Sequence, residues 1–253
     1  MPIVDWANAQ GTPGWYKARS GMPTASNFHL IMTPKTMKPS ESRKGYACRL
    51  ILERLMNWQA DSLDKIEHIA AGKANEPIAV AKLELVFDVT TQPIGFVKTN
   101  DGRFGASPDR VVLTDQNHID TVVECKCPTV PVQMERFLFG EDKGEYRCQR
   151  QGQMWVAEAD KAIFFSYNER MPDVIVEDGR DEGFLSKLED CLERFSDELE
   201  GWTEQARRWG AFQKFAEATP IEAAHAKNLR TGPVMSEEEL DGLINQEHYK
   251  WGG

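Results

Sequence analysis

The chain has 253 residues, 41% of them hydrophobic and 28% charged, which is enough for one sizeable core and predicts a single α/β domain followed by a tail. The formal net charge of −10 at pH 7 excludes a protein that simply coats nucleic acid, because such binding depends largely on neutralising phosphates, but not an enzyme that grips DNA locally. No apolar run is long enough to span a membrane, and the first residues, MPIVDWANAQ, lack the features of a signal peptide, so we expect a cytoplasmic protein.

Charged residues are unevenly distributed along the chain. Residues 1–60 contain eight Lys and Arg against three Asp and Glu, whereas residues 173–200 contain three against eleven. This asymmetry predicts a basic, DNA-facing surface built largely from the N-terminal third, with an acidic exterior elsewhere. The five cysteines show no zinc-like spacing, so we interpret them as small buried or free residues of a reducing compartment.

A candidate phosphate-binding segment lies near the N-terminus, where W-x-K-x-R is followed by T-A-S. Thr24 or Ser26 can cap a short helix that runs to Met32, and Arg19 would lie beside the N-terminus of that helix. A helix N-terminus with a hydroxyl and a guanidinium nearby is a suitable cradle for a terminal phosphate. The alternative is an ordinary helix cap beside a surface arginine.

Two helical patterns precede the central strands. Apolar spacing predicts one helix over residues 42–58, whose arginines face either DNA or solvent. A second pattern covers about residues 62–87, and Pro77 within it favours a first turn or a kink, so two helices may also meet near Glu76. Glu76, Glu84 and Asp88 are three acidic candidates for a site in this region, and the residues alone do not choose among them.

The central feature of the sequence is a predicted strand pair. Two β-rich runs, residues 110–113 and 121–123, flank a polar turn, so one strand begins at Asp109 and the next ends in Glu124-Cys125-Lys126. Because side chains alternate between the faces of a strand, Glu124 and Lys126 share one face and Cys125 lies on the other. A hairpin with a solvated polar rim is the alternative.

These strand ends predict a metal site. Asp109 and Glu124 would repel each other at neighbouring strand ends unless a divalent cation or a proton lay between them. Oxygen-rich sites suit Mg²⁺ or Mn²⁺, and we assign Asp109, Glu124 and the intervening Cys125 to the ion. Lys126, near a metal-bound water, can orient that water or lower its pKa for attack on a phosphodiester.

The chain continues with a helical pattern over residues 130–139 and a glutamine-rich helix over residues 146–156. Tyr146 and Gln149 lie three positions apart on this helix and share a face. A glutamine-rich exposed helix without a catalytic role is the alternative reading of that pattern.

The C-terminal part alternates short strands with a long helix and then changes character. Apolar runs predict strands at residues 162–167 and 174–176, and an apolar stripe predicts an acidic helix from Phe184 to about Phe215. Residues 217–253 read as a linker and a short capped helix, which serves as a subunit or partner contact or as a flexible end. The predicted organisation is therefore a domain over residues 1–216 and a tail over 217–253.

Taken in order, these motifs resemble the phage lambda exonuclease, or YqaJ-like viral recombinase, family of the PD-(D/E)xK nuclease superfamily. The resemblance is carried by Ser107-Pro108-Asp109 followed by Glu124-Cys125-Lys126-Cys127-Pro128, and it covers about residues 14–215. Supporting motifs are W-x-K-x-R with T-A-S, G-x-x-x-E ending at Glu76, and Y-x-x-Q with M-W. The resemblance implies an α/β fold with a PD-(D/E)xK restriction-endonuclease-like core, in which helices flank a central mixed β-sheet.

The resemblance also implies roles for individual residues. It makes Glu76 the third carboxylate of the metal site and Gln149 a residue that positions the attacking water or the scissile phosphate. Arg19, Ser26 and Tyr146 would then bind the 5′-phosphate of a DNA end.

The expected activity is a Mg²⁺- or Mn²⁺-dependent 5′-to-3′ exonuclease on double-stranded DNA ends that leaves 3′ single-stranded tails for recombination. By resemblance, we expect a ring-shaped homotrimer that passes DNA to a single-strand annealing protein, in the bacterial host cytoplasm if the protein is phage-encoded. The alternatives are a restriction- or repair-type endonuclease on the same core, and a DNA-binding recombination accessory protein whose nuclease site is inactive.

Overall fold

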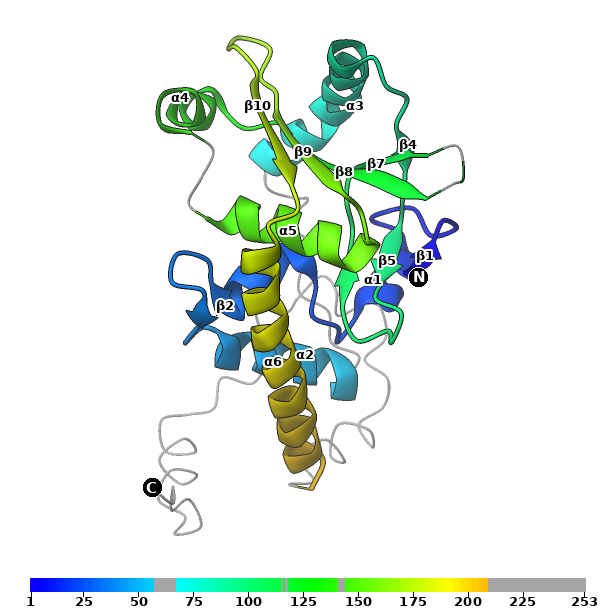
Figure 1. Cartoon of the computed structure of the whole chain (residues 1–253), viewed down its shortest axis with the longest axis vertical. Helices are drawn as coiled ribbons and strands as arrows, with labels where there is room; N and C mark the ends of the chain where they lie inside the picture. The colour runs from blue at the N-terminus through cyan, green and yellow to red at the C-terminus, as the bar shows by residue number, and fades with distance from the viewer. Residues whose placement is uncertain (57–66, 115, 117, 141–143, 209–253) are drawn as a thin grey trace. The chain divides into compact units, whose positions relative to one another are not determined.

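The computed structural model describes residues 1–56, 67–114, 116, 118–140 and 144–208, and the contacts within it group Met1–Gly210 into one compact unit (Figure 1). The predicted boundary after residue 216 and the tail over residues 217–253 lie outside the described residues. Among the described helices, none has both the length and the apolar character that crossing a bilayer requires.

A five-stranded mixed sheet forms the centre of the fold, in the order β10-β9-β8-β7-β4. Strands β8 and β9 are parallel, and the other neighbours in this sheet are antiparallel. The parallel pair requires a crossover, which the chain makes through α4 (Val130–Phe139) and α5 (Glu145–Ala157). The strands are β4 (Gln92–Pro93), β7 (Arg110–Leu113), β8 (Ile119–Lys126), β9 (Lys161–Ser166) and β10 (Val174–Gly179).

The central strands β8 and β9 are buried on both faces, so the sheet is covered on both sides there. On one face, Val123 and Cys125 of β8 pack against Ala79, Val80 and Leu83 of α3 (Glu67–Phe87). On the other face, the sheet packs against α5, within a core that also includes α2 (Arg43–Met56) and α6 (Glu182–Arg208). The predicted central mixed sheet flanked by helices is therefore confirmed.

The N-terminal segments form smaller elements beside this core. A three-stranded sheet contains β1 (Ile3–Asp5), β5 (Phe96–Lys98) and β6 (Gly105–Ala106), and β2 (Met32–Thr33) pairs with β3 (Lys38–Pro39). The chain also forms α1 (Pro13–Arg19) and the short 3-10 helix η1 (Ala25–Leu30). A Cβ atom on Gly152 of α5 would lie 2.5 Å from Cδ2 of Phe28, so this glycine allows α5 and η1 to approach closely.

Most predicted helices and strands are present, with two corrections. The segment that begins at Thr24 is a 3-10 helix of six residues, and Thr24 makes no side-chain capping bond, so it does not offer the expected α-helix N-terminus. The helix around Pro77 is one element that continues through the proline, rather than two helices meeting near Glu76. Residues 62–66 of its predicted range lie outside the described residues.

The arginines of α2 are a further correction, this time to the expected basic surface. Arg43 pairs with Glu198 at 3.0 Å and Arg54 pairs with Glu200 at 2.6 Å, so two of the arginines bind acids of α6. The basic N-terminal third and the acidic segment near residue 190 therefore neutralise each other in part where α2 packs against α6.

Candidate functional site

The predicted strand pair places Asp109 beside the end of β8. Arg110 of β7 pairs with Val123 of β8, and the Asp109 N–H donates to the Val123 carbonyl at 3.0 Å. The backbone pairing of the two strands ends there. The next N–H of β8 on this side, that of Cys125, donates instead to the Asp109 carboxylate at 2.8 Å. Asp109 is thus fixed against the backbone between Glu124 and Lys126, as the sequence predicted.

Glu124 and Lys126 lie on the same face of β8 and contact each other. Glu124 is only 3% exposed, and the Lys126 ammonium donates to its Oε1. The same ammonium lies 4.0 Å from Oδ2 of Asp109. One positive group therefore borders both carboxylates, which offsets part of the cost of burying them.

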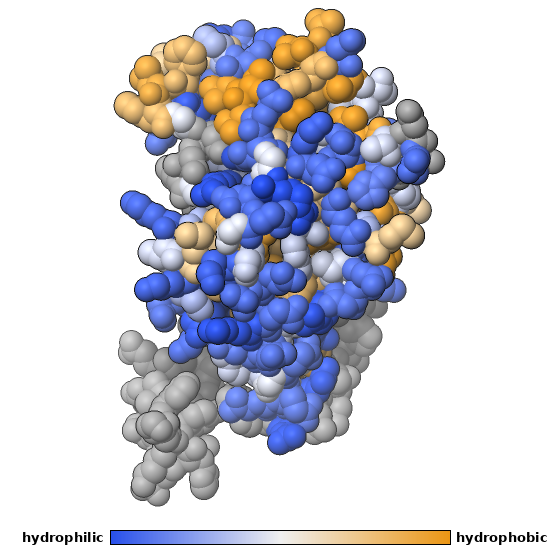
Figure 2. Space-filling model, viewed as in Figure 1, coloured by the Kyte–Doolittle hydropathy of each residue, from blue (hydrophilic) through white to orange (hydrophobic). Residues whose placement is uncertain are grey.

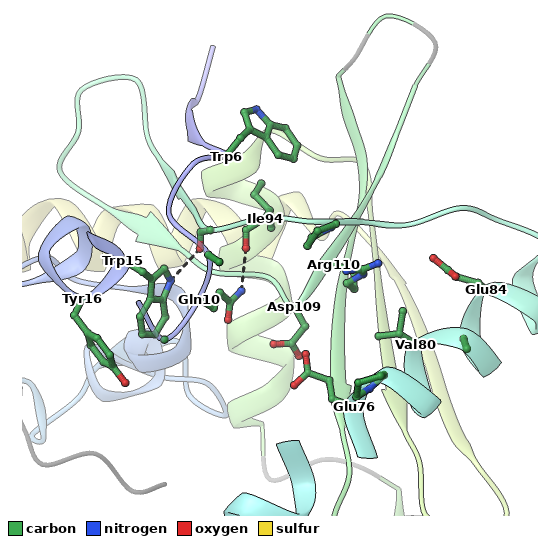
Figure 3. A pocket seen from close by; sticks show the side chains of 16 residues that line it. Trp6, Gln10, Trp15, Tyr16, Glu76, Val80, Glu84, Ile94, Asp109 and Arg110 are labelled. Atoms are coloured by element: carbon green, nitrogen blue, oxygen red, sulfur yellow. Dashed lines mark hydrogen bonds between the residues drawn. The ribbon is translucent and has the colours of Figure 1, made fainter. Parts of the chain in front are cut away.

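Of the three acidic candidates on or just after α3, Glu76 is the one that lies beside Asp109. Glu76 and Asp109 line the same cleft, of about 730 Å³, and their carboxylates point toward each other (Figure 3). Glu84 also borders this cleft, but its Oε1 accepts hydrogen bonds from the N–H and hydroxyl of Thr91, at 2.8 and 2.6 Å. Asp88 is exposed in a left-handed turn just after the helix ends. Glu76 is therefore the acid that approaches Asp109.

The clustering of these acids changes their proton affinity. Burial, followed by the charges of Glu124 and Glu76, raises the pKa of Asp109 to about 8, against the opposing effect of Lys126. Burial lowers the pKa of Lys126, but Glu124 and Asp109 outweigh it, so the pKa is raised and the amine stays protonated. The site therefore concentrates more negative charge than Lys126 alone neutralises, which is the situation that a divalent cation relieves.

The donor atoms suit Mg²⁺ or Mn²⁺, which prefer carboxylate and carbonyl oxygens. Within the described chain, no three His, Cys, Asp or Glu side chains are already gathered as a complete metal cage, and Lys126 lies against Glu124. The candidate ligands are instead related in pairs: Glu76 and Asp109 line one cleft, and the Lys126 ammonium borders the carboxylates of both Asp109 and Glu124. This set fits a cation that exchanges with the ammonium.

Cys125 was predicted to be a metal ligand, without a choice between its thiol and its backbone carbonyl. Its thiol packs in the apolar cluster between β8 and α3, where burial, followed by the charges of Asp109 and Glu124, raises its pKa and keeps the thiol protonated. Its N–H, however, points to Asp109. Because the N–H and C=O of a strand residue point to the same side, the Cys125 carbonyl also faces Asp109. Only this carbonyl can join an oxygen-ligated ion. All five cysteines of the chain are free.

A second, smaller cavity of about 220 Å³ lies on the other side of Glu124. It brings together residues from distant segments, among them several of the predicted site residues: Arg19, Ser26, Glu124, Lys126 and Gln149. The Arg19 guanidinium lies 4.2 Å from the centre of the Trp15 ring and makes no ion pair with any residue that the structure describes. Ser26 is exposed, with its hydroxyl 3.3 Å from that of Thr24. A cationic and a hydroxyl group therefore face the same cavity as the lysine of the site.

Tyr146 does not line this cavity. Its hydroxyl accepts a hydrogen bond from Arg136 at 2.9 Å, and its ring packs 5.1 Å from that of Phe164. Tyr146 is thus placed to support the buried side of α5, apart from Arg19 and Ser26, and the structure does not bring these three residues together as phosphate ligands.

Several residues that form the site were not singled out in the sequence. Gln153, one turn after Gln149 on α5, donates from Nε2 to Oε2 of Glu124 at 2.7 Å and is 1% exposed. Gln10 donates to the Pro108 carbonyl at 2.7 Å and so ties the N-terminal loop to the residue before Asp109. Trp15 donates from its indole N–H to Ser107 Oγ at 3.0 Å. The sequence signals for them were the i, i+4 spacing of Gln149 and Gln153 and the tryptophan of the W-x-K-x-R motif.

The chain matches a known protein family. The family model of the YqaJ-like viral recombinase domain matches residues 14–160. No sequence among the curated proteins matches the chain significantly.

Two solved exonucleases resemble this structure. The alkaline exonuclease from Laribacter hongkongensis is 29% identical, with a TM-score of 0.69 over 79% of this chain and 98% of that one, and its complex with dAMP gives the same values. A phage-related exonuclease from Haemophilus somnus 129PT shares the fold at 14% identity, with a TM-score of 0.58 over 73% of this chain and 96% of that one. The predicted fold and the predicted class of enzyme, a nuclease that acts on DNA, are confirmed. The chain belongs to the YqaJ-like viral recombinase family.

Proposed function

We propose that this nuclease is a Mg²⁺- or Mn²⁺-dependent exonuclease that degrades one strand of double-stranded DNA from its 5′ end and leaves a 3′ single-stranded tail for recombination by strand annealing. One observation carries the proposal: Glu124 and Lys126, which adjoin Asp109, line the same cavity as Arg19 and Ser26. A cleavage site and a candidate site for a terminal phosphate are therefore adjacent. The likeness to two exonucleases supports this reading.

Each residue of the site would have a separate role in the reaction. Asp109, Glu124 and Glu76, with the Cys125 carbonyl, would hold the divalent ion. When bound, this ion would provide a nucleophile near neutral pH and offset the charge that develops on the leaving oxygen. Lys126 is the cation that would orient the attacking water toward the phosphodiester, and Gln149, which lines the same cavity, would position that water or the phosphate.

The terminal phosphate would be bound at the far end of the same cavity. Arg19 can donate charge-assisted hydrogen bonds to phosphate oxygens, and Ser26 can donate its hydroxyl. Burial lowers the pKa of Arg19, with the charges of Tyr46 and Glu53 opposing that effect, and a phosphate would favour the charged form further. The role proposed for Tyr146 is indirect, because its hydroxyl is engaged by Arg136.

The assembly that we propose is a homotrimer, which acts in the bacterial cytoplasm and passes the exposed strand to a single-strand annealing protein. A subunit contact needs an apolar surface, and Figure 2 shows apolar side chains gathered over α4. Phe139 is 81% exposed and Leu138 is 59% exposed, which is unusual for large apolar side chains of a surface helix. This surface is where we place the contact with a second copy of the chain.

The test of the activity is nucleotide release from linear, 5′-phosphorylated duplex DNA in the presence of Mg²⁺. We expect release from the 5′ end by the wild type and a loss of at least about a hundredfold in Lys126→Ala, a typical effect of removing a group that acts on the reacting water. Equal digestion by both proteins would contradict the role of Lys126.

Two further substrates separate the alternatives. Cleavage of covalently closed plasmid would favour a restriction- or repair-type endonuclease, because a closed circle has no end for Arg19 and Ser26 to bind. Binding of linear duplex without any release of nucleotides would favour an inactive accessory protein. Release from 3′ ends would contradict the proposed polarity.

A further inference from the structure

Glu124 is held by two donors that come from different elements. The ammonium of Lys126 donates to Oε1 of Glu124, and Nε2 of Gln153 on α5 donates to Oε2 at 2.7 Å. Both carboxylate oxygens are therefore fixed. Gln153 is 1% exposed, whereas the Lys126 side chain is 32% exposed, so the glutamine is the more confined of the two donors.

The two donors should respond differently to a divalent cation. The Lys126 ammonium borders both Glu124 and Asp109, which is also the position that a shared cation would take. Like charges repel, so a bound cation weakens the hold of Lys126 on Glu124. Gln153 is uncharged and bonds to the other oxygen of Glu124. It is therefore the donor that can remain in place.

The orientation of the Gln153 amide follows from its partner. A carboxylate only accepts hydrogen bonds, so the NH₂ end of the amide must face Glu124. The other end, Oε1, is then buried and has no hydrogen-bond partner within the described chain. A buried acceptor without a donor is destabilising, so packing alone does not explain a glutamine here.

Gln151, two residues earlier on the same helix, shows the contrast. It is 2% exposed, and both ends of its amide are bonded, with Nε2 donating to the Gly179 carbonyl and Oε1 accepting from the Asp181 N–H, each at 2.9 Å. Its bonds join α5 to the segment between β10 and α6, away from Glu124. Gln151 is therefore a structural glutamine and a matched control for Gln153.

We propose that Gln153 is a positioning residue, which keeps Glu124 oriented for a divalent cation while Lys126 is released from it. The residue acts through Glu124, to which its amide donates. The inference rests on the proposed function in one respect, the assignment of Asp109 and Glu124 as ligands of the cation. Hydrogen bonds from a residue behind a metal ligand typically change metal affinity by about 10- to 100-fold when they are removed.

The test is Mn²⁺ binding to the full chain, measured by titration calorimetry on wild type, Gln153→Met and Gln151→Met, with circular dichroism to verify folding. We expect Gln153→Met to bind Mn²⁺ at least about tenfold more weakly than the wild type. Gln151→Met should lower the unfolding temperature but leave the Mn²⁺ affinity unchanged, because its bonds are remote from Glu124. Equal affinities of wild type and Gln153→Met, or equal losses in both variants, would overturn the proposal.

A second readout separates positioning from catalysis. In nucleotide release from duplex ends, a high concentration of Mn²⁺ should restore Gln153→Met toward the wild-type rate but should not restore Lys126→Ala. Failure of excess Mn²⁺ to rescue Gln153→Met would contradict a role in orienting the ligand. If the wild type itself binds no Mn²⁺, the metal-dependent function fails as well, whereas normal wild-type binding with an unchanged Gln153→Met refutes only the role of Gln153.

Discussion

Asp109→Asn removes one negative charge from the site but keeps an acceptor for the Cys125 N–H. Because the pKa of Asp109 rises from 3.8 to about 8 in the folded chain, the folded state binds this proton more tightly than the unfolded state does. The ionisation of Asp109 therefore costs nothing below about pH 4, progressively destabilises the wild type as the pH rises through this window, and reaches its full cost above about pH 8.

The magnitude of this loss of stability follows from the width of the pH range between the two pKa values of Asp109. Each pH unit inside it costs the wild type about 1.4 kcal/mol, so the loss between about pH 5 and pH 7 is at most about 2.7 kcal/mol. The charges of Glu124 and Lys126 act on Asp109 in opposite directions, so a substitution that removes only Asp109 recovers less than this value. We expect the stability of Asp109→Asn, relative to the wild type, to increase by about 1 to 2 kcal/mol between these two pH values.

Guanidinium unfolding in EDTA at about pH 5 and pH 7 measures this difference directly. Asp120→Asn is the matched control, because Asp120 lies near the start of β8, accepts a hydrogen bond from Thr121 and lies 3.8 Å from Lys161, away from the end of the strand that carries Glu124 and Lys126. Added Mg²⁺ should reverse the order and stabilise the wild type over Asp109→Asn, since only the wild type keeps the full set of ligands. A difference between wild type and Asp109→Asn that does not change with pH would refute the reasoning.

Three further substitutions test other parts of the site and the assembly. Arg19→Ala should slow release from 5′-phosphorylated ends by at least about tenfold, equivalent to about 1.4 kcal/mol, with little change on 5′-hydroxyl ends in single-turnover digests. Glu76→Gln should lower Mg²⁺-dependent nucleotide release, whereas Glu84→Gln should not, because Glu84 is engaged by Thr91; equal losses would contradict the choice between them. Phe139→Glu should reduce self-association in light scattering, and an unchanged mass would place the subunit contact elsewhere.

The arrangement of the site side chains on the hairpin of β7 and β8 was predictable from the sequence. The alternation along Glu124, Cys125 and Lys126 fixes which side chains share a face, and two β-rich runs around a polar turn bring Asp109 to the neighbouring strand end. Both statements depend only on strand geometry and on short sequence separations. The choice of Glu76 over Glu84 followed from the family resemblance, and the hydrogen bonds of Thr91 to Glu84 now give it a physical reason.

Contacts between distant segments were not predictable from local patterns. Gln10 reaches the Pro108 carbonyl, and Trp15 reaches Ser107, across separations that periodicity does not encode. Gln153 could be placed on the same helix face as Gln149, but its pairing with Glu124 depends on how closely α5 packs on β8. Tyr146 matches a motif, and its hydroxyl accepts a hydrogen bond from Arg136 of α4, a contact that the motif does not encode.

The number of charged residues in a sequence segment does not give the electrostatic potential at the surface of the folded protein. The excess of basic residues in the first segment suggested a DNA-facing surface, yet Arg43 and Arg54 lie against Glu198 and Glu200 of α6. Each such pair contributes little stability near the surface, but it removes a positive charge from the potential that DNA would meet. Arg19 makes no such pair with the described residues and lies at the cavity of the site. In a chain with a net charge of −10, affinity for a DNA end should therefore depend on a few cations near the scissile position rather than on a broad basic surface.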